Sequence, residues 1–283
     1  MKYLITGANG MLGQDLQQAL AGRDVTALSR AELDVTDADA VRAAVAGHDV
    51  VVNAAAYTKV DDAETHEDEA YAINATGAAN LARAAAEHGA ILVQISTDYV
   101  FDGMATTPYP EDAPLNPVSA YGRTKAAGER LAQEANPGRT IIVRTAWLYG
   151  AHGPNFARTM LRLAASHDTV SVVTDQVGQP SWTLDLARQI VALLDTGATS
   201  GIFNGTASGQ ASWFDFAKAV FRNAGLDPDR VTATDSSQFV RPAPRPAYSV
   251  LGHDSWRKVG LDPMRDWSSA LSEAATQGVL ENE

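Results

Sequence analysis

Gly7-Ala8-Asn9-Gly10-Met11-Leu12-Gly13 follows the apolar run Tyr3-Leu4-Ile5 and precedes a helical pattern that extends to Ala21. Glycine at the first, fourth and seventh positions permits a tight turn, lets a pyrophosphate approach the backbone, and lets the next helix pack closely on the sheet. The free N–H groups at the start of that helix attract anions. This strand–turn–helix segment indicates a dinucleotide-binding unit, and a purely structural glycine-rich turn is the alternative.

Short apolar runs alternate with longer alanine-rich helical patterns through the first half of the chain. Such alternation indicates βαβ units with a parallel sheet and helices on both faces, and a mixed α+β domain is less favoured. The predicted fold class is therefore α/β, a Rossmann-type doubly wound parallel sheet. We expect strands at 3–5, 25–28, 50–52, 91–93 and 140–143, and helices at 11–21, 37–46, 69–87 and 121–134.

The second half has a looser pattern after Trp147. Residues 241–246 include three prolines and should form an extended loop. The apolar spacing predicts strands at 170–173 and 201–204, and helices at 155–165, 184–194, 213–224 and 264–278.

The composition excludes several classes of function. The chain has 283 residues, with 22 Lys+Arg against 34 Asp+Glu, and a formal net charge of −12 at pH 7. That charge repels phosphate backbones, so nucleic acid is not an expected partner. The chain has no cysteine, which excludes disulfides, iron–sulfur clusters and thiol nucleophiles. No apolar run approaches the ~20 residues that span a bilayer, and no signal-peptide core is present, so we expect a cytoplasmic protein without a membrane partner.

The end of the second predicted strand bears on the choice of cofactor. NAD-selective sites usually carry a carboxylate about 20 residues after the glycine turn. This chain has Ser29-Arg30 there, and a hydroxyl and a guanidinium suit a 2′-phosphate better. NADPH is therefore favoured, whereas the nearby Glu32 leaves NADH open. An alternative of equal weight is that Arg30 is only a solvated surface charge.

Tyr121-Gly122-Arg123-Thr124-Lys125 places a phenol and an ammonium on one face of a helix. A nearby ammonium favours the phenolate and should lower the tyrosine pKa from its usual value of about 10. Most pairs with this spacing are exposed helix turns, but this one lies downstream of a dinucleotide turn. Ser96-Thr97-Asp98 follows a strand directly, and the carboxyl ends of parallel strands face the ligand crevice. A hydroxyl there could hold a substrate carbonyl beside Tyr121.

Together these motifs resemble the extended short-chain dehydrogenase/reductases and, more narrowly, the dTDP-4-dehydrorhamnose reductase family. The resemblance covers nearly the whole chain, and 96–101 and 245–249 are its most specific segments. It is carried by Asn53-Ala54-Ala55-Ala56-Tyr57-Thr58-Lys59-Val60-Asp61, Ser96-Thr97-Asp98-Tyr99-Val100-Phe101-Asp102-Gly103, Arg144-Thr145-Ala146-Trp147-Leu148-Tyr149-Gly150, Asn155-Phe156, Asp175-Gln176-Val177-Gly178-Gln179-Pro180 and Arg245-Pro246-Ala247-Tyr248-Ser249.

The resemblance implies roles for particular residues. Thr97, Tyr121 and Lys125 match a catalytic triad in which Tyr121 is the proton donor. The implied sugar contacts are Thr97, Asp98, Tyr121 and Trp147. With Gly7 of the turn, the expected cofactor-binding residues are Gly10, Met11, Leu12, Arg30, Asp34, Val35, Ala56, Tyr57, Thr58, Tyr121 and Lys125.

The resemblance also implies an activity and a division of the chain. The expected reaction is the NAD(P)H-dependent reduction of the C4 keto group of dTDP-4-dehydro-β-L-rhamnose, a dTDP-4-keto-6-deoxyhexose, to dTDP-L-rhamnose. Residues 1–146, with about 182–204, should form the NAD(P)-binding Rossmann domain. Residues 147–181 and 205–283 should form a smaller substrate-binding region for the nucleotide part of the substrate.

Two departures from the family pattern bear on specificity and on metal binding. Ser181-Trp182 stands where the family usually has threonine, which adds an indole near the expected sugar or nucleotide pocket. Some members form a dimer bridged by Mg²⁺ through glutamates. Asp15, a shorter carboxylate, occupies one such position, so a metal is not predicted and a homodimer stays open.

Other functions remain in competition. The first is a 4-ketoreductase for another dTDP-deoxysugar. The second is a non-catalytic subunit of the type that regulates methionine adenosyltransferase, which has this fold; the intact Thr97–Tyr121–Lys125 set argues against it. An epimerase or dehydratase that recycles a tightly held NAD⁺ is less favoured. The six histidines show no metal-ligand spacing, and Trp213, Trp256 and Trp267 are expected to be core residues.

Overall fold

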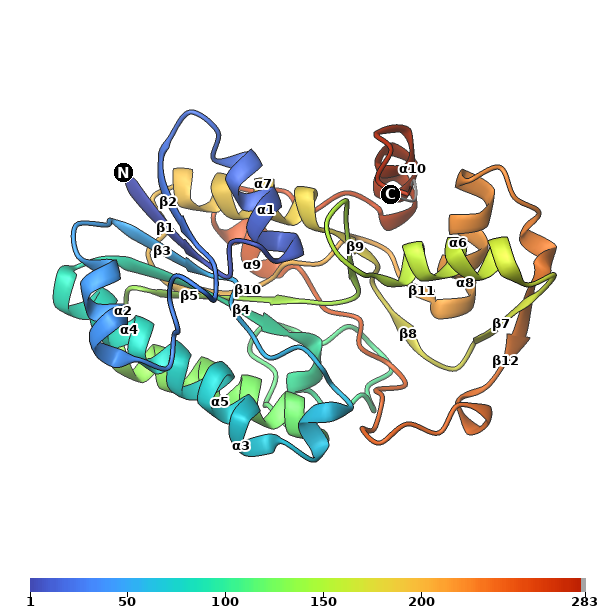
Figure 1. Ribbon diagram of the computed structural model, residues 1–283, viewed down its shortest axis with the longest axis horizontal. Coiled ribbons are helices and arrows are strands. Elements are labelled where there is room, and N and C mark those ends of the chain that lie inside the picture. Colours follow the sequence, from blue (N-terminus) through green and yellow to red (C-terminus); the bar gives the residue numbers. More distant parts are fainter. Residues whose placement is uncertain (281–283) are drawn as a thin grey trace.

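A six-stranded parallel sheet occupies the larger of two lobes in the computed structural model, which describes residues 1–280 (Figure 1). Its strands are β1 (Lys2–Thr6), β2 (Asp24–Leu28), β3 (Val50–Asn53), β4 (Ile91–Thr97), β5 (Thr140–Thr145) and β10 (Gly201–Asn204). They lie in the order β10-β5-β4-β3-β1-β2, so the chain winds outward from β1 in both directions. This order confirms the predicted doubly wound α/β fold.

Helical layers cover both faces of the sheet (Figure 1). Because successive residues of a strand face opposite sides, Tyr3 and Ile5 of β1 pack into one layer and Leu4 into the other. The first layer consists of α1 (Met11–Ala19), α7 (Thr183–Asp195) and α9 (Asp254–Lys258), and the second of α2 (Ala38–Val45), α4 (Gly77–His88) and α5 (Ala120–Ala135).

Within residues 1–280, no helix is long and apolar enough to cross a bilayer.

The helix predicted at 69–87 is interrupted. It begins as α3 (Glu67–Tyr71), passes through a π-helical turn at Ala72–Thr76 and continues as α4. Asn74 lies in this turn, and its side-chain amide donates a hydrogen bond to the Thr124 hydroxyl of α5 at 3.1 Å. A π-turn inserts one extra residue without changing which residues are apolar. The prediction of one continuous helix was therefore wrong at this turn.

The smaller lobe packs around aromatic side chains that include Trp182, Phe216 and Phe221. Three short two-stranded ribbons connect its helices, and of their six strands only β7 was predicted from the sequence. The ribbons pair β6 (Leu148–Tyr149) with β9 (Ser181–Trp182), β7 (Val170–Val173) with β12 (Val231–Thr234), and β8 (Val177–Gly178) with β11 (Ala211–Ser212). The helices of this lobe are α6 (Phe156–Ser166) and α8 (Trp213–Asn223), and its short 3₁₀ turns lie at Pro228–Arg230 and Ser236–Gln238. The larger lobe has 3₁₀ turns at Asp62–Glu64 and Asp98–Val100.

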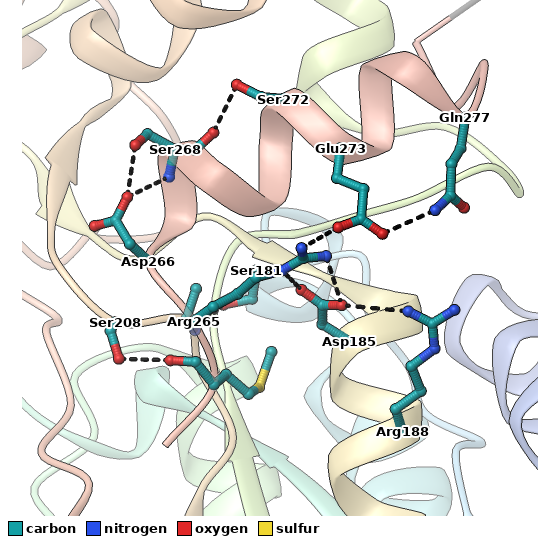
Figure 2. Close-up of polar contacts among 12 residues, drawn as sticks. Ser181, Asp185, Arg188, Ser208, Arg265, Asp266, Ser268, Ser272, Glu273 and Gln277 are labelled. Carbon is teal, nitrogen blue, oxygen red and sulfur yellow. Dashed lines mark hydrogen bonds and ion pairs between the residues drawn. The ribbon is translucent and has the colours of Figure 1, made fainter. Parts of the chain in front are cut away.

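Arg265 attaches the last helix, α10 (Trp267–Thr276), to α7 of the larger lobe (Figure 2). Its guanidinium donates to the Asp185 carboxylate at 2.7 and 3.0 Å and also pairs with Glu273 of α10. Asp266 caps α10, so the helix begins three residues later than the predicted start at residue 264. The lobes are therefore joined by an ion-pair cluster as well as by the chain.

A buried ion pair joins α5 to β5. Arg144 donates to the Glu129 carboxylate with N–O distances of 2.8 and 3.0 Å, and each side chain is only 2% exposed. Ser96 of β4 donates to the same carboxylate at 2.5 Å, and Arg144 also donates to the Glu111 carbonyl at 2.9 Å. Each charge would be strongly unfavourable alone in this interior, so the two stabilise the fold only together.

Replacing Glu129 should therefore destabilise the protein strongly. Glu129→Gln keeps the shape of the side chain but leaves the Arg144 charge unpaired, so the free energy of unfolding should fall by about 3–5 kcal/mol. Glu134→Gln is the matched control, because Glu134 pairs with Arg130 on the same helix but in solvent. That change should cost less than about 1 kcal/mol. Equal losses in urea unfolding would contradict this account of the buried pair.

Candidate active site

A crevice crosses the carboxyl ends of the central strands at the glycine turn. A cavity of about 480 Å³ lies on one side of Gly10 and a cavity of about 210 Å³ on the other. Gly10 and Ala54–Ala56 line both, so the cavities are two halves of one crevice. Of the predicted residues, the larger half includes Gly10, Met11, Leu12, Ala56, Thr58, Tyr121 and Lys125, and the smaller half includes Gly7, Gly10, Arg30, Asp34, Val35 and Ala56.

The glycine turn has the geometry that a bound pyrophosphate needs. Gly7 has a φ of +70°, and a Cβ atom there would lie 2.6 Å from the Ala55 nitrogen. Gly13 packs against the Gly7 carbonyl so closely that a side chain would not fit. Gly10 precedes α1 without a side-chain cap, so the first N–H groups of the helix remain available. The residues present therefore fit a dinucleotide phosphate at this helix N-terminus.

Ser29, Arg30 and Glu32 end up in different surroundings. The Glu32 carboxylate accepts hydrogen bonds from the Ser29 backbone and hydroxyl at 2.8 and 2.7 Å, which lowers the pKa of Glu32. The exposed Arg30 side chain lines the smaller cavity with Asp34 and Val35. The hydroxyl and the carboxylate are thus bonded to each other, whereas the guanidinium lies at the cavity.

Thr97, Tyr121 and Lys125 come together from β4 and α5. Ser119 caps α5 by accepting a hydrogen bond from the Gly122 backbone at 3.1 Å. Gly122 lies so close to the Tyr99 carbonyl that a side chain would not fit, which brings the helix against the turn after Thr97. The hydroxyl of Thr97 contacts Tyr121, and the Tyr99 ring meets the Tyr121 ring edge-on with centroids 5.5 Å apart.

The charges around Tyr121 differ from the expectation. Burial raises the pKa of Tyr121 to about 12, and the contact with Thr97 lowers it only in part. The Lys125 ammonium donates to the Ile95 carbonyl at 2.6 Å, and burial lowers its pKa to about 8 against the opposing effect of Glu129. The predicted lowering of the tyrosine pKa by Lys125 was therefore wrong, because the ammonium is directed at a carbonyl and the phenol is desolvated. Tyr121 is a neutral phenol at pH 7, the form that can donate a proton.

Four predicted residues lie away from the crevice lining. Tyr57 lines a neighbouring cavity of about 340 Å³ instead of the crevice. Thr97 and Asp98 are buried and line neither half of the crevice, and Thr97 donates to the Asp98 carboxylate at 2.9 Å. Burial raises the pKa of Asp98 to about 6. The half-buried Trp147 stacks on Trp213 at the junction with the smaller lobe. The roles of these residues, like those of the crevice residues, remain predictions.

The surroundings of Asp15 do not fit Mg²⁺. Asp15 is buried, and burial raises its pKa, whereas a metal ligand must give up its proton. Its neighbours include His152, whose Nε2 atom lies 3.9 Å from the carboxylate, and the cationic Arg188. Among residues 1–280, no three His, Asp or Glu side chains gather as a metal-binding set.

Sequence reasoning missed two groups of residues beside the site. Glu129 lies four residues after Lys125 on the same helix, a spacing that places both on one face. Its partner Arg144 comes from a different strand, so no local pattern signals the pair. Trp213 was predicted only as a core residue, and no pattern signals that its ring stacks on Trp147.

Comparison with known proteins places this fold and site in a family. The family model described as "RmlD substrate binding domain" matches residues 1–279. A dTDP-4-keto-6-deoxy-D-glucose reductase of Streptomyces niveus is 50% identical, covering 96% of each chain. A dTDP-4-dehydrorhamnose reductase of Streptomyces griseus is also 50% identical, covering 96% of this chain and 92% of its own.

Solved structures agree with the sequence relatives. The crystal structure of a dTDP-4-dehydrorhamnose reductase from Bacillus anthracis, in complex with NADP, is 39% identical to this chain with a TM-score of 0.93. The match covers 98% of this chain and 100% of that one. The chain therefore belongs to the dTDP-4-dehydrorhamnose reductase family, the NAD(P)H-dependent oxidoreductases that its sequence resembles.

Proposed function

We propose that this chain reduces the C4 keto group of dTDP-4-dehydro-β-L-rhamnose to a hydroxyl, giving dTDP-L-rhamnose, with NADPH as the preferred reductant. The observation that carries the proposal is the meeting of Thr97, Tyr121 and Lys125 beside the crevice that the glycine turn forms. Reduction of another dTDP-4-keto-6-deoxysugar is the second candidate. It has support because the S. niveus and S. griseus reductases are equally similar to this chain.

The chain would hold the cofactor along the crevice. The N–H groups of the glycine turn face the pyrophosphate, Asp34 and Val35 flank the adenine, and Arg30 lies beside the adenosine ribose. Ala56, Thr58 and Lys125 line the half of the crevice that would take the nicotinamide. Bound there, the reduced cofactor supplies a hydride to the carbonyl carbon.

The side chains at the nicotinamide end would supply the proton and stabilise the negative charge that develops during the reaction. Tyr121 donates its phenolic proton to the carbonyl oxygen, so that the hydride and this proton together complete the alcohol. Thr97 can turn its hydroxyl from Asp98 toward the same oxygen and stabilise the developing charge. In the proposed reaction the Lys125 ammonium turns from the Ile95 carbonyl toward Tyr121, where its positive charge stabilises the phenolate that remains. Solvent protons then restore the phenol.

The smaller lobe would hold the nucleotide part of the substrate. A cavity of about 320 Å³ there is lined by side chains that include Gln210 and Phe214, an amide and an aromatic ring suited to a pyrimidine. We propose residues 1–146 and 182–204, together with α9 on the face of the sheet, as the cofactor-binding unit, and 147–181 with the rest of 205–283 as the substrate-binding region. The sugar would then lie between the two cavities, in contact with Thr97, Asp98, Tyr121 and Trp147.

Removing the phenolic hydroxyl should abolish turnover and spare cofactor binding. Tyr121→Phe keeps the ring against Tyr99 but has no proton to give, so kcat should fall about 10²–10⁴-fold. NADPH affinity, followed by fluorescence titration, should stay at the wild-type value. Tyr71→Phe, a change at an exposed tyrosine, is the control and should leave both unchanged. A Tyr121→Phe enzyme with wild-type kcat would refute the assignment of the proton donor.

The rate should fall on the alkaline side as Lys125 loses its proton. Because the pKa of Lys125 is lowered to about 8, its charge is present below that pH and lost above it. The ratio kcat/KM, which reports groups of the enzyme before its substrates bind, should therefore decrease between about pH 7 and pH 9. Lys125→Arg keeps its charge throughout this range, so whatever activity it retains should lack the decrease. The same decrease in both proteins would contradict the role given to the lysine charge.

Arg30 should determine the preference for NADPH. Arg30→Ala removes one charge-assisted contact with the 2′-phosphate, so KM for NADPH should rise about 10-fold or more. KM for NADH, which lacks this phosphate, should not change. Arg42→Ala is the control, because Arg42 pairs with Glu87 on the surface. A parallel rise for both cofactors would show that Arg30 does not read the 2′-phosphate.

A further inference from the structure

Trp147 has an unusual backbone conformation and lies beside the crevice. Its φ is +48°, and within residues 1–280 it is the only residue other than glycine with a positive φ. A left-handed backbone is unfavourable for a bulky side chain and persists only where the surroundings impose it. Trp147 comes directly after β5, two residues beyond Thr145 and next to Leu148, and both of these line the larger half of the crevice.

Two contacts from the smaller lobe fix the indole ring of Trp147. The ring stacks on Trp213, the first residue of α8, with centroids 3.5 Å apart and planes 7° from parallel. The same ring lies against Gly178, where a Cβ atom would come within 2.5 Å of the Trp147 ring. A larger residue at 178 would therefore displace the indole.

Trp213 and Gly178 are held independently of Trp147. Gly178 pairs with Ala211 in the β8–β11 ribbon, which leads directly into Trp213. The Ser212 hydroxyl caps α8 by accepting a hydrogen bond from the Asp215 backbone N–H at 3.0 Å, and the Asp215 carboxylate accepts one from the Ser212 backbone N–H at 3.1 Å. Phe156 packs against Trp213 with ring centroids 4.5 Å apart. The ribbon and the cap therefore fix the surface on which the Trp147 indole packs.

The contact of Trp147 with Trp213 and Gly178 lies at the boundary between the two proposed halves of the substrate site. Thr145 and Leu148, on either side of Trp147, line the crevice. Val177 and Ser212, the neighbours of Gly178 and Trp213, line the 320 Å³ cavity of the smaller lobe. A substrate whose sugar lies in the crevice and whose nucleotide lies in the smaller lobe must pass this boundary.

We infer that Trp213 is a positioning residue for substrate binding: together with Gly178 it holds the Trp147 indole where the sugar of a nucleotide sugar meets it. This inference rests on the proposed sugar contact of Trp147. Trp213 itself need not touch the substrate. Its loss should weaken nucleotide-sugar binding and leave the cofactor and the chemical step unaffected.

The test combines kinetics with circular dichroism in the full-length protein. Trp213→Leu should raise KM for the dTDP-4-keto sugar about fivefold, in line with the loss of one aromatic pair, with kcat and KM for NADPH unchanged. Trp213→Phe keeps an aromatic surface and should restore part of the affinity. Gly178→Ala should raise the same KM while Trp213 is still present. Trp267→Leu is the matched control, because Trp267 is another half-buried tryptophan of this lobe, and its ring meets Phe216 edge-on instead of stacking on an indole.

The dichroism reports on the stack without reference to catalysis. Two stacked indoles couple their transitions, so the wild type and Trp267→Leu should show an exciton couplet that Trp213→Leu and Trp147→Phe lack. An absent couplet in the wild type, or a persistent one in Trp213→Leu, would overturn the inference. If Trp213→Leu does not fold, Gly178→Ala and Trp213→Phe still decide between the outcomes.

The kinetics separate this inference from the proposed function. If Trp147→Phe leaves KM for the nucleotide sugar unchanged, the proposed sugar contact fails and the positioning role fails with it. If Trp147→Phe raises KM but Trp213→Leu and Gly178→Ala do not, the sugar contact stands and only the positioning role of Trp213 is overturned.

Discussion

The buried ion pair between Glu129 and Arg144 is the contact on which the geometry of the site depends. It binds α5 to β5, and the Ser96 hydroxyl extends it to β4. Three residues that the proposed reaction uses lie within four residues of a member of this set. Thr97 follows Ser96, Lys125 precedes Glu129 by one helical turn, and Trp147 comes three residues after Arg144. Because the charges cannot be separated without a large cost, these three parts of the chain keep a fixed relation.

The parallel sheet supplies the second constraint. All its strands end at one edge, and the first helix begins there with N–H groups that no side chain caps. The start of α1, suited to a phosphate, and the hydroxyls of Thr97 and Tyr121 therefore lie at the same edge of the sheet. Arg265 anchors the last helix of the smaller lobe, which we propose binds the substrate, to α7 (Figure 2). Burial gives the two titrating groups different tasks: it keeps Tyr121 a neutral acid and leaves Lys125 a charge that alkali removes.

Local patterns made much of this predictable. The spacing of Gly7, Gly10 and Gly13, the alternation of strands and helices, and the Tyr121–Lys125 pair each depend on residues close in sequence, so the fold and most of the crevice lining follow from them. Contacts between distant segments leave no such pattern. The π-turn at Ala72–Thr76 depends on how α5 packs, and the direction of the Lys125 ammonium depends on the Ile95 carbonyl. Neither the Arg144–Glu129 pair nor the Trp147–Trp213 stack has a local signature.

The proposed transfer of hydrogen from the reduced cofactor to C4 of a dTDP-linked keto sugar can be followed with an isotopic label. The most direct measurement uses NADPH that carries deuterium at the transferred position of its nicotinamide C4, with dTDP-4-dehydro-β-L-rhamnose as substrate, and locates the deuterium in the product by NMR. We expect dTDP-L-rhamnose with one deuterium on the sugar C4 carbon. Failure of the labelled cofactor to be consumed, or deuterium found at another carbon or in water, would contradict it.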